Sequence, residues 1–188
     1  MFYVEFIHWD RSVPIEIFRF LGQQSSGWKE NSPDRIVLQL GRTLRFGPQP
    51  GYLAIWEIPN IGRLDEWETY FHSADSMINR RSQAMHRAIT IERAGLFNAL
   101  IIGDLKSYPL YYLEFYKPFA PSRAADFPRN ALVYLLNRVG FLGPDFEAIA
   151  IWGCHTYADV EALTCRRSPG VPDAADAGVY RKFGEEVI

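Results

Sequence analysis

Hydrophobic and polar positions follow a strand-and-helix pattern through the first half of the chain. Runs rich in aromatic and β-branched residues are typical of strands, whereas apolar residues spaced three and four apart indicate one face of a helix. Leu64, Trp67, Tyr70 and Phe71 have this helical spacing. The pattern predicts strands at residues 2–9, 35–46, 52–58 and 88–97 and helices at residues 15–22 and 63–86.

The second half of the chain repeats this order of elements. Strands are expected at residues 111–118, 139–142, 146–152 and 180–188, helices at 121–137 and 157–164, and a linker at 98–109. The order strand, helix, strand, strand, helix, strand is that of the ferredoxin-like βαββαβ unit. The sequence therefore predicts an α+β fold of two tandem ferredoxin-like units, residues 1–100 and 110–188, packed sheet to sheet as in a dimeric α/β-barrel.

Short identities support an internal repeat. The segment Phe2-Tyr3-Val4-Glu5-Phe6 recurs as Tyr111-Tyr112-Leu113-Glu114-Phe115, 109 positions later. Ala54-Ile55-Trp56 recurs as Ala150-Ile151-Trp152, 96 positions later. The matches keep their order along the chain, and self-similarity of this kind is the sequence signature of a duplicated structural unit.

Composition narrows the classes of protein that the chain fits. The 188 residues are 48% hydrophobic, which is enough for a folded core, and 15% aromatic. A net charge of −2 excludes the basic footprint of a nucleic-acid-binding protein. The chain contains no run of 18 apolar residues, so no membrane span is predicted. The N-terminus also lacks the pattern of a signal peptide, a basic region followed by an apolar stretch. We expect a soluble cytoplasmic protein, monomer or homodimer, with no nucleic-acid or membrane partner.

One segment resembles a known family. Tyr52-Leu53-Ala54-Ile55-Trp56-Glu57 followed by Arg63-Leu64-Asp65-Glu66-Trp67 is similar to the NIPSNAP-like pattern of the dimeric α/β-barrel superfamily, with Gly153 replacing the glutamate in the second copy. The resemblance implies a protein that handles small molecules in the interior of a barrel. Cofactor-free monooxygenases, polyketide cyclases, lyases, isomerases and some haem proteins share that fold, so the fold by itself does not select a reaction.

Strand alternation divides the candidate site residues into two faces. Side chains two apart along a strand share a face. Phe2, Val4 and Phe6 form a uniformly apolar face, which we assign to packing against helices. The opposite face would then line the barrel interior with Tyr3, Glu5, Ile7, Tyr52, Ala54 and Trp56 from the first copy and Tyr112, Glu114, Tyr116, Ala148, Ala150 and Trp152 from the second.

Two symmetry-related carboxylates among aromatic rings suggest acid/base chemistry. Burial raises the pKa of a carboxylic acid, which suits Glu5 and Glu114 to act as general acid or base near neutral pH. Tyr3 and Tyr112 would donate hydrogen bonds to them or to a substrate. His8, at a strand end, is an alternative base. In the competing interpretation the two glutamates form structural ion pairs, with candidate partners Arg42, Arg93 and Arg138.

These residues lead to a functional expectation. The chain is expected to be a cofactor-independent enzyme of lyase, isomerase or cyclase type that acts on a small apolar or aromatic metabolite. Substrate contacts are expected from Tyr52, Trp56, Tyr116, Trp152 and His155. The spacing of cysteine and histidine predicts no metal, and no glycine-rich phosphate loop predicts a nucleotide; haem held by a single histidine stays open. The alternatives are a cofactor-free monooxygenase, a non-catalytic small-molecule binding protein, and a structural interaction protein with a filled barrel.

Overall fold

The computed structural model describes residues 1–9, 34–43, 51–72, 89–140, 143–165 and 170–182. Its strands are β1 (Phe2–Trp9), β2 (Arg35–Arg42), β3 (Tyr52–Glu57), β4 (Ile89–Ile102), β5 (Leu110–Tyr116), β6 (Leu132–Arg138), β7 (Ala148–Cys154) and β8 (Asp176–Lys182). Its helices are α2 (Arg63–His72), α4 (Tyr157–Cys165) and the 3₁₀ helix η1 (Pro121–Asp126).

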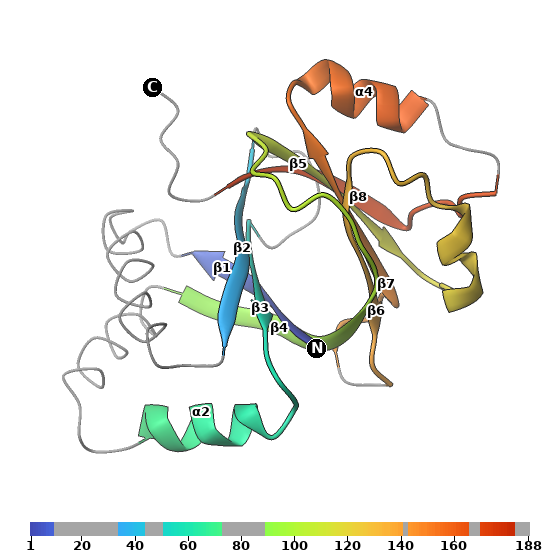
Figure 1. The fold of residues 1–188 in the computed structure, drawn as a ribbon. Helices are drawn as coiled ribbons and strands as arrows, with labels where there is room; N and C mark the ends of the chain where they lie inside the picture. The colour runs from blue at the N-terminus through green and yellow to red at the C-terminus, as the bar shows by residue number, and fades with distance from the viewer. Residues whose placement is uncertain (10–33, 44–50, 73–88, 141–142, 166–169, 183–188) are drawn as a thin grey trace.

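The strands form one closed antiparallel barrel, shown in Figure 1, with the order β1-β3-β2-β8-β5-β7-β6-β4. Each half of the chain supplies four neighbouring strands in equivalent order, β4-β1-β3-β2 and β8-β5-β7-β6. The pairs β2–β8 and β4–β6 join the two halves. The pairing register is also equivalent, because Glu5 lies opposite Ala54 in the first half and Glu114 lies opposite Ala150 in the second. The sequence repeat therefore corresponds to a repeat in strand topology.

The predicted α+β tandem of ferredoxin-like βαββαβ units, packed sheet to sheet, is wrong. The described chain is a mostly-β molecule in which one continuous barrel replaces two separate sheets. Hydrogen bonding across both seams leaves no sheet edge between the halves, which is how a closed barrel removes edge strands. The helix expected at residues 15–22 lies outside the described residues.

The largest local error falls in the second half. Residues 121–137 were expected to form a helix, but only Pro121–Asp126 is helical, as the 3₁₀ helix η1, and Leu132–Arg138 is strand β6. Pro128 interrupts the helical pattern, and the run Leu132-Val133-Tyr134-Leu135-Leu136 is buried throughout. A short run buried on both faces is ambiguous between helix and strand, and here strand pairing decides it. The strand expected at 139–142 is wrong at residues 139 and 140, and residues 141 and 142 lie outside the described residues.

Side chains from all eight strands fill the barrel interior. One buried cluster includes Phe2, Val4 and Phe6 of β1 together with Tyr111, Leu113 and Phe115 of β5. The strands β1 and β5 lie on opposite sides of the barrel, and the Phe6 and Phe115 ring centroids are 6.2 Å apart. Phe146, just before β7, packs 5.3 Å from Phe6 and 4.9 Å from Phe115. These rings occupy the space that was expected to hold a substrate.

The assignment of strand faces was therefore reversed. The apolar face of β1 and β5 points into the barrel, and the face that carries Glu5 and Glu114 points outward. The physical reason is that a small closed barrel must fill its interior with side chains, so it encloses its most apolar face. On the outer side of the first half, Trp67 of α2 packs with Tyr3 and Trp56. On the outer side of the second half, the cluster of Tyr112, Tyr116 and Trp152 includes Val160 of α4. It also includes Phe119 and Phe127, which lie on either side of η1.

Candidate functional site

Glu5 lies on the outer face of the barrel between two small residues. Its cross-strand neighbours are Ala54 on β3 and Ala94 on β4. The second glutamate is placed in the same way, because Glu114 lies between Ala150 on β7 and Ala177 on β8. Alanine is small, so neither cross-strand neighbour crowds the glutamate side chain between them.

A tryptophan holds each of the two carboxylates. The Trp56 indole Nε1 donates to Glu5 Oε2 at 3.0 Å, and Trp152 Nε1 donates to Glu114 Oε2 at 3.0 Å. In both halves the tryptophan comes from the strand next to the glutamate and lies opposite a tyrosine, Tyr3 or Tyr112. The sequence analysis grouped these residues on one face, and the structure brings each Glu–Trp pair into contact.

The two carboxylates differ in their remaining surroundings. Glu114 is 4% exposed and also accepts from the hydroxyls of Tyr116, at 2.6 Å, and Tyr112, at 3.5 Å. Glu5 is partly exposed, and within the described residues its carboxylate accepts from Trp56 alone. The position equivalent to Tyr116 is Ile7, which has no hydrogen-bonding group. Glu114 is thus embedded in a satisfied network, and Glu5 is not.

The surroundings of Glu5 shift two ionisation equilibria. Burial raises the pKa of Glu5 from 4.5 to about 7, against the opposing effect of the Trp56 hydrogen bond. Burial also raises the pKa of Tyr3 to about 12, and the negative charge of Glu5 adds to this increase. A carboxyl group whose pKa lies near 7 can either accept or donate a proton under neutral conditions. Tyr3 stays protonated there and can donate a hydrogen bond.

Helix α2 supplies an aromatic wall beside Glu5. The Trp67 ring lies edge-on to Trp56 at 5.0 Å and to Tyr3 at 5.7 Å. The buried carboxylate of Asp34 fixes this helix, because its Oδ2 accepts from Trp67 Nε1 and from Arg63 Nε, both at 2.8 Å. The sequence analysis did not name Asp34, Arg63 or Trp67 as site residues. Charged residues next to a strand and at a helix start are too common to mark a site, and only their tertiary contact does so.

Among the described contacts, those of His8, His155 and Tyr52 do not join either carboxylate cluster. His8 is exposed and lies 3.6 Å from Glu92. His155 is exposed beside the ring of Tyr108, at 5.3 Å, and its backbone N–H donates to Asp159 at the start of α4. Tyr52 pairs with Ile7 across β1 and β3 and is partly exposed.

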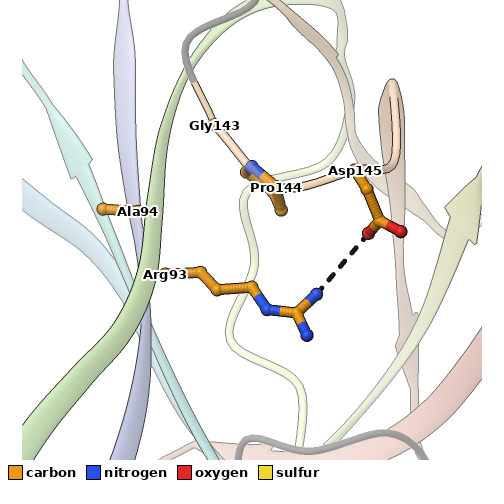
Figure 2. A pocket seen from close by; sticks show the side chains of 5 residues that line it. All are labelled: Arg93, Ala94, Gly143, Pro144 and Asp145. Atoms are coloured by element: carbon orange, nitrogen blue, oxygen red, sulfur yellow. Dashed lines mark hydrogen bonds and ion pairs between the residues drawn. The ribbon is translucent and has the colours of Figure 1, made fainter.

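The ion-pair interpretation finds no support from two of its three arginines. Arg93 pairs with Asp145 at 3.5 Å, and a side-chain nitrogen of Arg138 donates to the Pro144 carbonyl oxygen. Among the salt bridges of the described ranges, neither arginine pairs with Glu5 or Glu114. Figure 2 shows Arg93 reaching across an open hollow that Ala94, Gly143, Pro144 and Asp145 also line. None of the site residues expected from the sequence lines this hollow.

Other chemistries have little basis in the described part of the chain. No group of three or more histidine, cysteine or carboxylate side chains is placed there to hold a metal ion. Burial raises the pKa of the Cys154 thiol to about 11, which disfavours the nucleophilic thiolate form.

No described helix has the length and apolar character needed to cross a membrane.

Comparison of the chain with protein-family models, with curated proteins and with solved structures found no match in any of the three.

Proposed function

We propose that this protein is a cofactor-independent enzyme in which Glu5 acts as general acid or base on a small apolar or aromatic molecule. The site lies on the outer face of the first half of the barrel, beside Trp56 and Trp67, and not in the filled interior. Reactions of lyase, isomerase or cyclase type fit a single carboxyl group that moves a proton.

The observation that carries the proposal is the difference between Glu5 and Glu114. The same strand position, the same flanking alanines and the same tryptophan donor occur in both halves. Within the described part of the chain, Glu114 also accepts from two tyrosine hydroxyls, and Glu5 accepts from none. A partly exposed carboxylate with one described donor has capacity for a substrate, and perturbed carboxylates of this kind cluster at functional sites.

Each neighbouring residue has a role in the proposal. Trp56 orients the carboxylate through its indole N–H. Tyr3 lies two residues before Glu5 on the same face of β1, and its hydroxyl serves as a hydrogen-bond donor to the substrate. Trp67, held on α2 by Asp34, excludes water from one side of the site and offers an apolar surface.

Proton transfer can be tested before the natural substrate is known. A panel of small aromatic carbonyl and hydroxyl compounds would be incubated with the protein in D₂O, and deuterium incorporation followed by NMR. Glu5→Gln should lower exchange of an active compound by about 10²-fold or more. The matched control is Glu57→Gln, an exposed carboxylate at the end of β3, which should keep full activity. Full activity in Glu5→Gln, with the fold verified by circular dichroism, would refute the proposal.

The filled interior favours a second candidate, a structural interaction protein without turnover. The barrel core is continuous from β1 to β5 through aromatic contacts, as in a scaffold that binds nothing inside. This candidate predicts that wild type and Glu5→Gln behave identically towards every compound of the panel.

A further inference from the structure

Because of the internal repeat, the side-chain contacts of one half can be compared with those at equivalent positions in the other half. The strands β1 and β3 pair in the same register as β5 and β7. Glu5, Ile7 and Trp56 therefore occupy the positions of Glu114, Tyr116 and Trp152. A group that contacts Glu114 in the second half therefore indicates which kind of group could contact Glu5 at the equivalent position in the first half.

In the second half, Glu114 binds a phenol that belongs to the protein itself. The Tyr116 hydroxyl donates to Glu114 Oε2 at 2.6 Å, the length of a strong O–H···O⁻ bond. The Tyr116 ring is fully buried and packs against Phe127 at 5.5 Å and Phe119 at 5.7 Å. The same oxygen accepts from Trp152. The complete arrangement is a carboxylate that binds one indole N–H and one phenolic O–H.

Among the described side chains of the first half, none supplies the phenol of this arrangement. Ile7 stands in the place of Tyr116, and the aromatic residue of that cross-strand pair is Tyr52, on β3. Within the described residues the Glu5 carboxylate keeps the indole donor alone. Glu5 as a whole residue has intermediate exposure, unlike the buried Glu114.

We propose that Glu5 binds the hydroxyl of a small phenolic compound, which supplies the hydrogen bond that Tyr116 supplies to Glu114. This inference rests on the proposed function, since it names the substrate class of that site. In its ionised form the Glu5 carboxylate only accepts hydrogen bonds, so a phenol fits that form better than a ketone or an ether does. The ring would lie against the indole of Trp56, since Ile7 itself is buried.

Binding of 4-methylphenol, the side-chain analogue of tyrosine, tests the inference directly. Protein labelled with ¹⁵N-tryptophan would be titrated while the Trp56 indole N–H signal is followed by NMR. We expect saturable binding at least tenfold tighter than that of toluene or 4-methylanisole, which lack the hydroxyl donor. Glu5→Gln should weaken the binding of 4-methylphenol at least tenfold, and Glu57→Gln should leave it unchanged. Equal binding of the three compounds, or no binding of 4-methylphenol, would overturn the inference.

A second variant rebuilds the arrangement of the second half in the first. Ile7→Tyr should place a phenol beside Glu5, shift the Trp56 indole signal of the free protein towards its 4-methylphenol-bound position, and abolish binding of added 4-methylphenol. Undiminished 4-methylphenol binding to a folded Ile7→Tyr protein would count against the inference. If this variant does not fold, the comparison of compounds on the wild type and Glu5→Gln decides the question by itself.

Failure of the inference and failure of the proposed function give different results. Hydroxyl-dependent binding that Glu5→Gln abolishes, without turnover of any phenol, supports the ligand class and removes the enzymatic role. Turnover of a non-phenolic compound that depends on Glu5, without 4-methylphenol binding, keeps the enzymatic role and overturns the ligand class.

Discussion

The ring of Tyr108 lies directly on the backbone of Gly153. A Cβ atom added to Gly153 would sit 2.2 Å from Cδ2 of Tyr108, far inside van der Waals contact. The equivalent first-half residue, Glu57, is exposed and pairs with Arg35. The replacement of glutamate by glycine between the two halves is therefore explained by the packing of Tyr108, without reference to a substrate.

Gly153→Ala should destabilise the fold. The added methyl group forces Tyr108 or β7 to move, and overpacking of a buried site costs about 1–3 kcal/mol. Urea denaturation measures the change in the free energy of unfolding. Gly51→Ala is the matched control, because nothing lies within 4 Å of its added Cβ. Tyr108→Ala removes the ring that the added methyl group meets. In the Gly153→Ala background it should therefore recover part of the free energy of unfolding lost to the clash. Strictly additive effects of the two substitutions would contradict this explanation.

The contribution of Glu5 to the stability of the fold should decrease as pH rises from about 4.5 to about 7. The raised pKa of Glu5 means that the folded state keeps this proton to higher pH than the unfolded state does. The stabilising contribution is therefore complete below the ordinary pKa of 4.5 and is lost as pH rises through about 7. The upper bound is about 1.4 kcal/mol for each pH unit between the two pKa values.

Glu5→Gln removes this dependence and should gain stability relative to the wild type across that pH range. Denaturation midpoints of the two proteins at pH 4, 5.5, 7 and 8 would measure the difference. Glu57→Gln, which removes an exposed carboxylate, is the control. A constant difference between wild type and Glu5→Gln at all four pH values would show that Glu5 titrates alike in the folded and unfolded states.

Tyr116→Phe should lower the free energy of unfolding by about 1.5–3 kcal/mol, the range for hydrogen bonds to charged groups. The change removes the donor 2.6 Å from the buried Glu114 carboxylate and leaves the ring in place. Thermal and urea denaturation measure it. Tyr157→Phe serves as control, since its hydroxyl bonds to Thr43 at an exposed position, where substitutions change stability by about 0.5 kcal/mol or less. Similar losses for the two variants would argue against a tightly held Glu114 network.

Arg63→Met should cost about 3 kcal/mol or more. The Asp34 side chain is 0% exposed, so removal of its cationic partner leaves a buried carboxylate with its charge uncompensated by Arg63. The indole of Trp67, which shares the same carboxylate oxygen, should become more solvent-exposed. The expected results are a lower denaturation midpoint and red-shifted tryptophan emission. Arg35→Met breaks an exposed ion pair and should change stability by about 1 kcal/mol at most; an equal effect of the two variants would refute the anchoring role of Asp34.

Several elements could be predicted from the sequence because their signals are local. The strand expected at residues 2–9 is β1, and the helix expected at 157–164 is α4, which ends at Cys165. Alternation along the strands grouped Glu5 with Tyr3 and Glu114 with Tyr112 on one face. The repeated Ala-Ile-Trp triplet predicted a tryptophan on the same face as each glutamate, and the structure pairs them. The error at residues 132–138 arose because a fully buried run carries no period.

The amino-acid sequence by itself determined which side chains share a face and which positions recur between the halves. Only the tertiary structure decided which face is enclosed, because alternation defines two faces and strand pairing over more than a hundred residues chooses between them. Closure through β2–β8 and β4–β6 enclosed the apolar face and left both glutamates outside. The difference between Glu5 and Glu114 is likewise tertiary, since it depends on the side chains that reach each carboxylate.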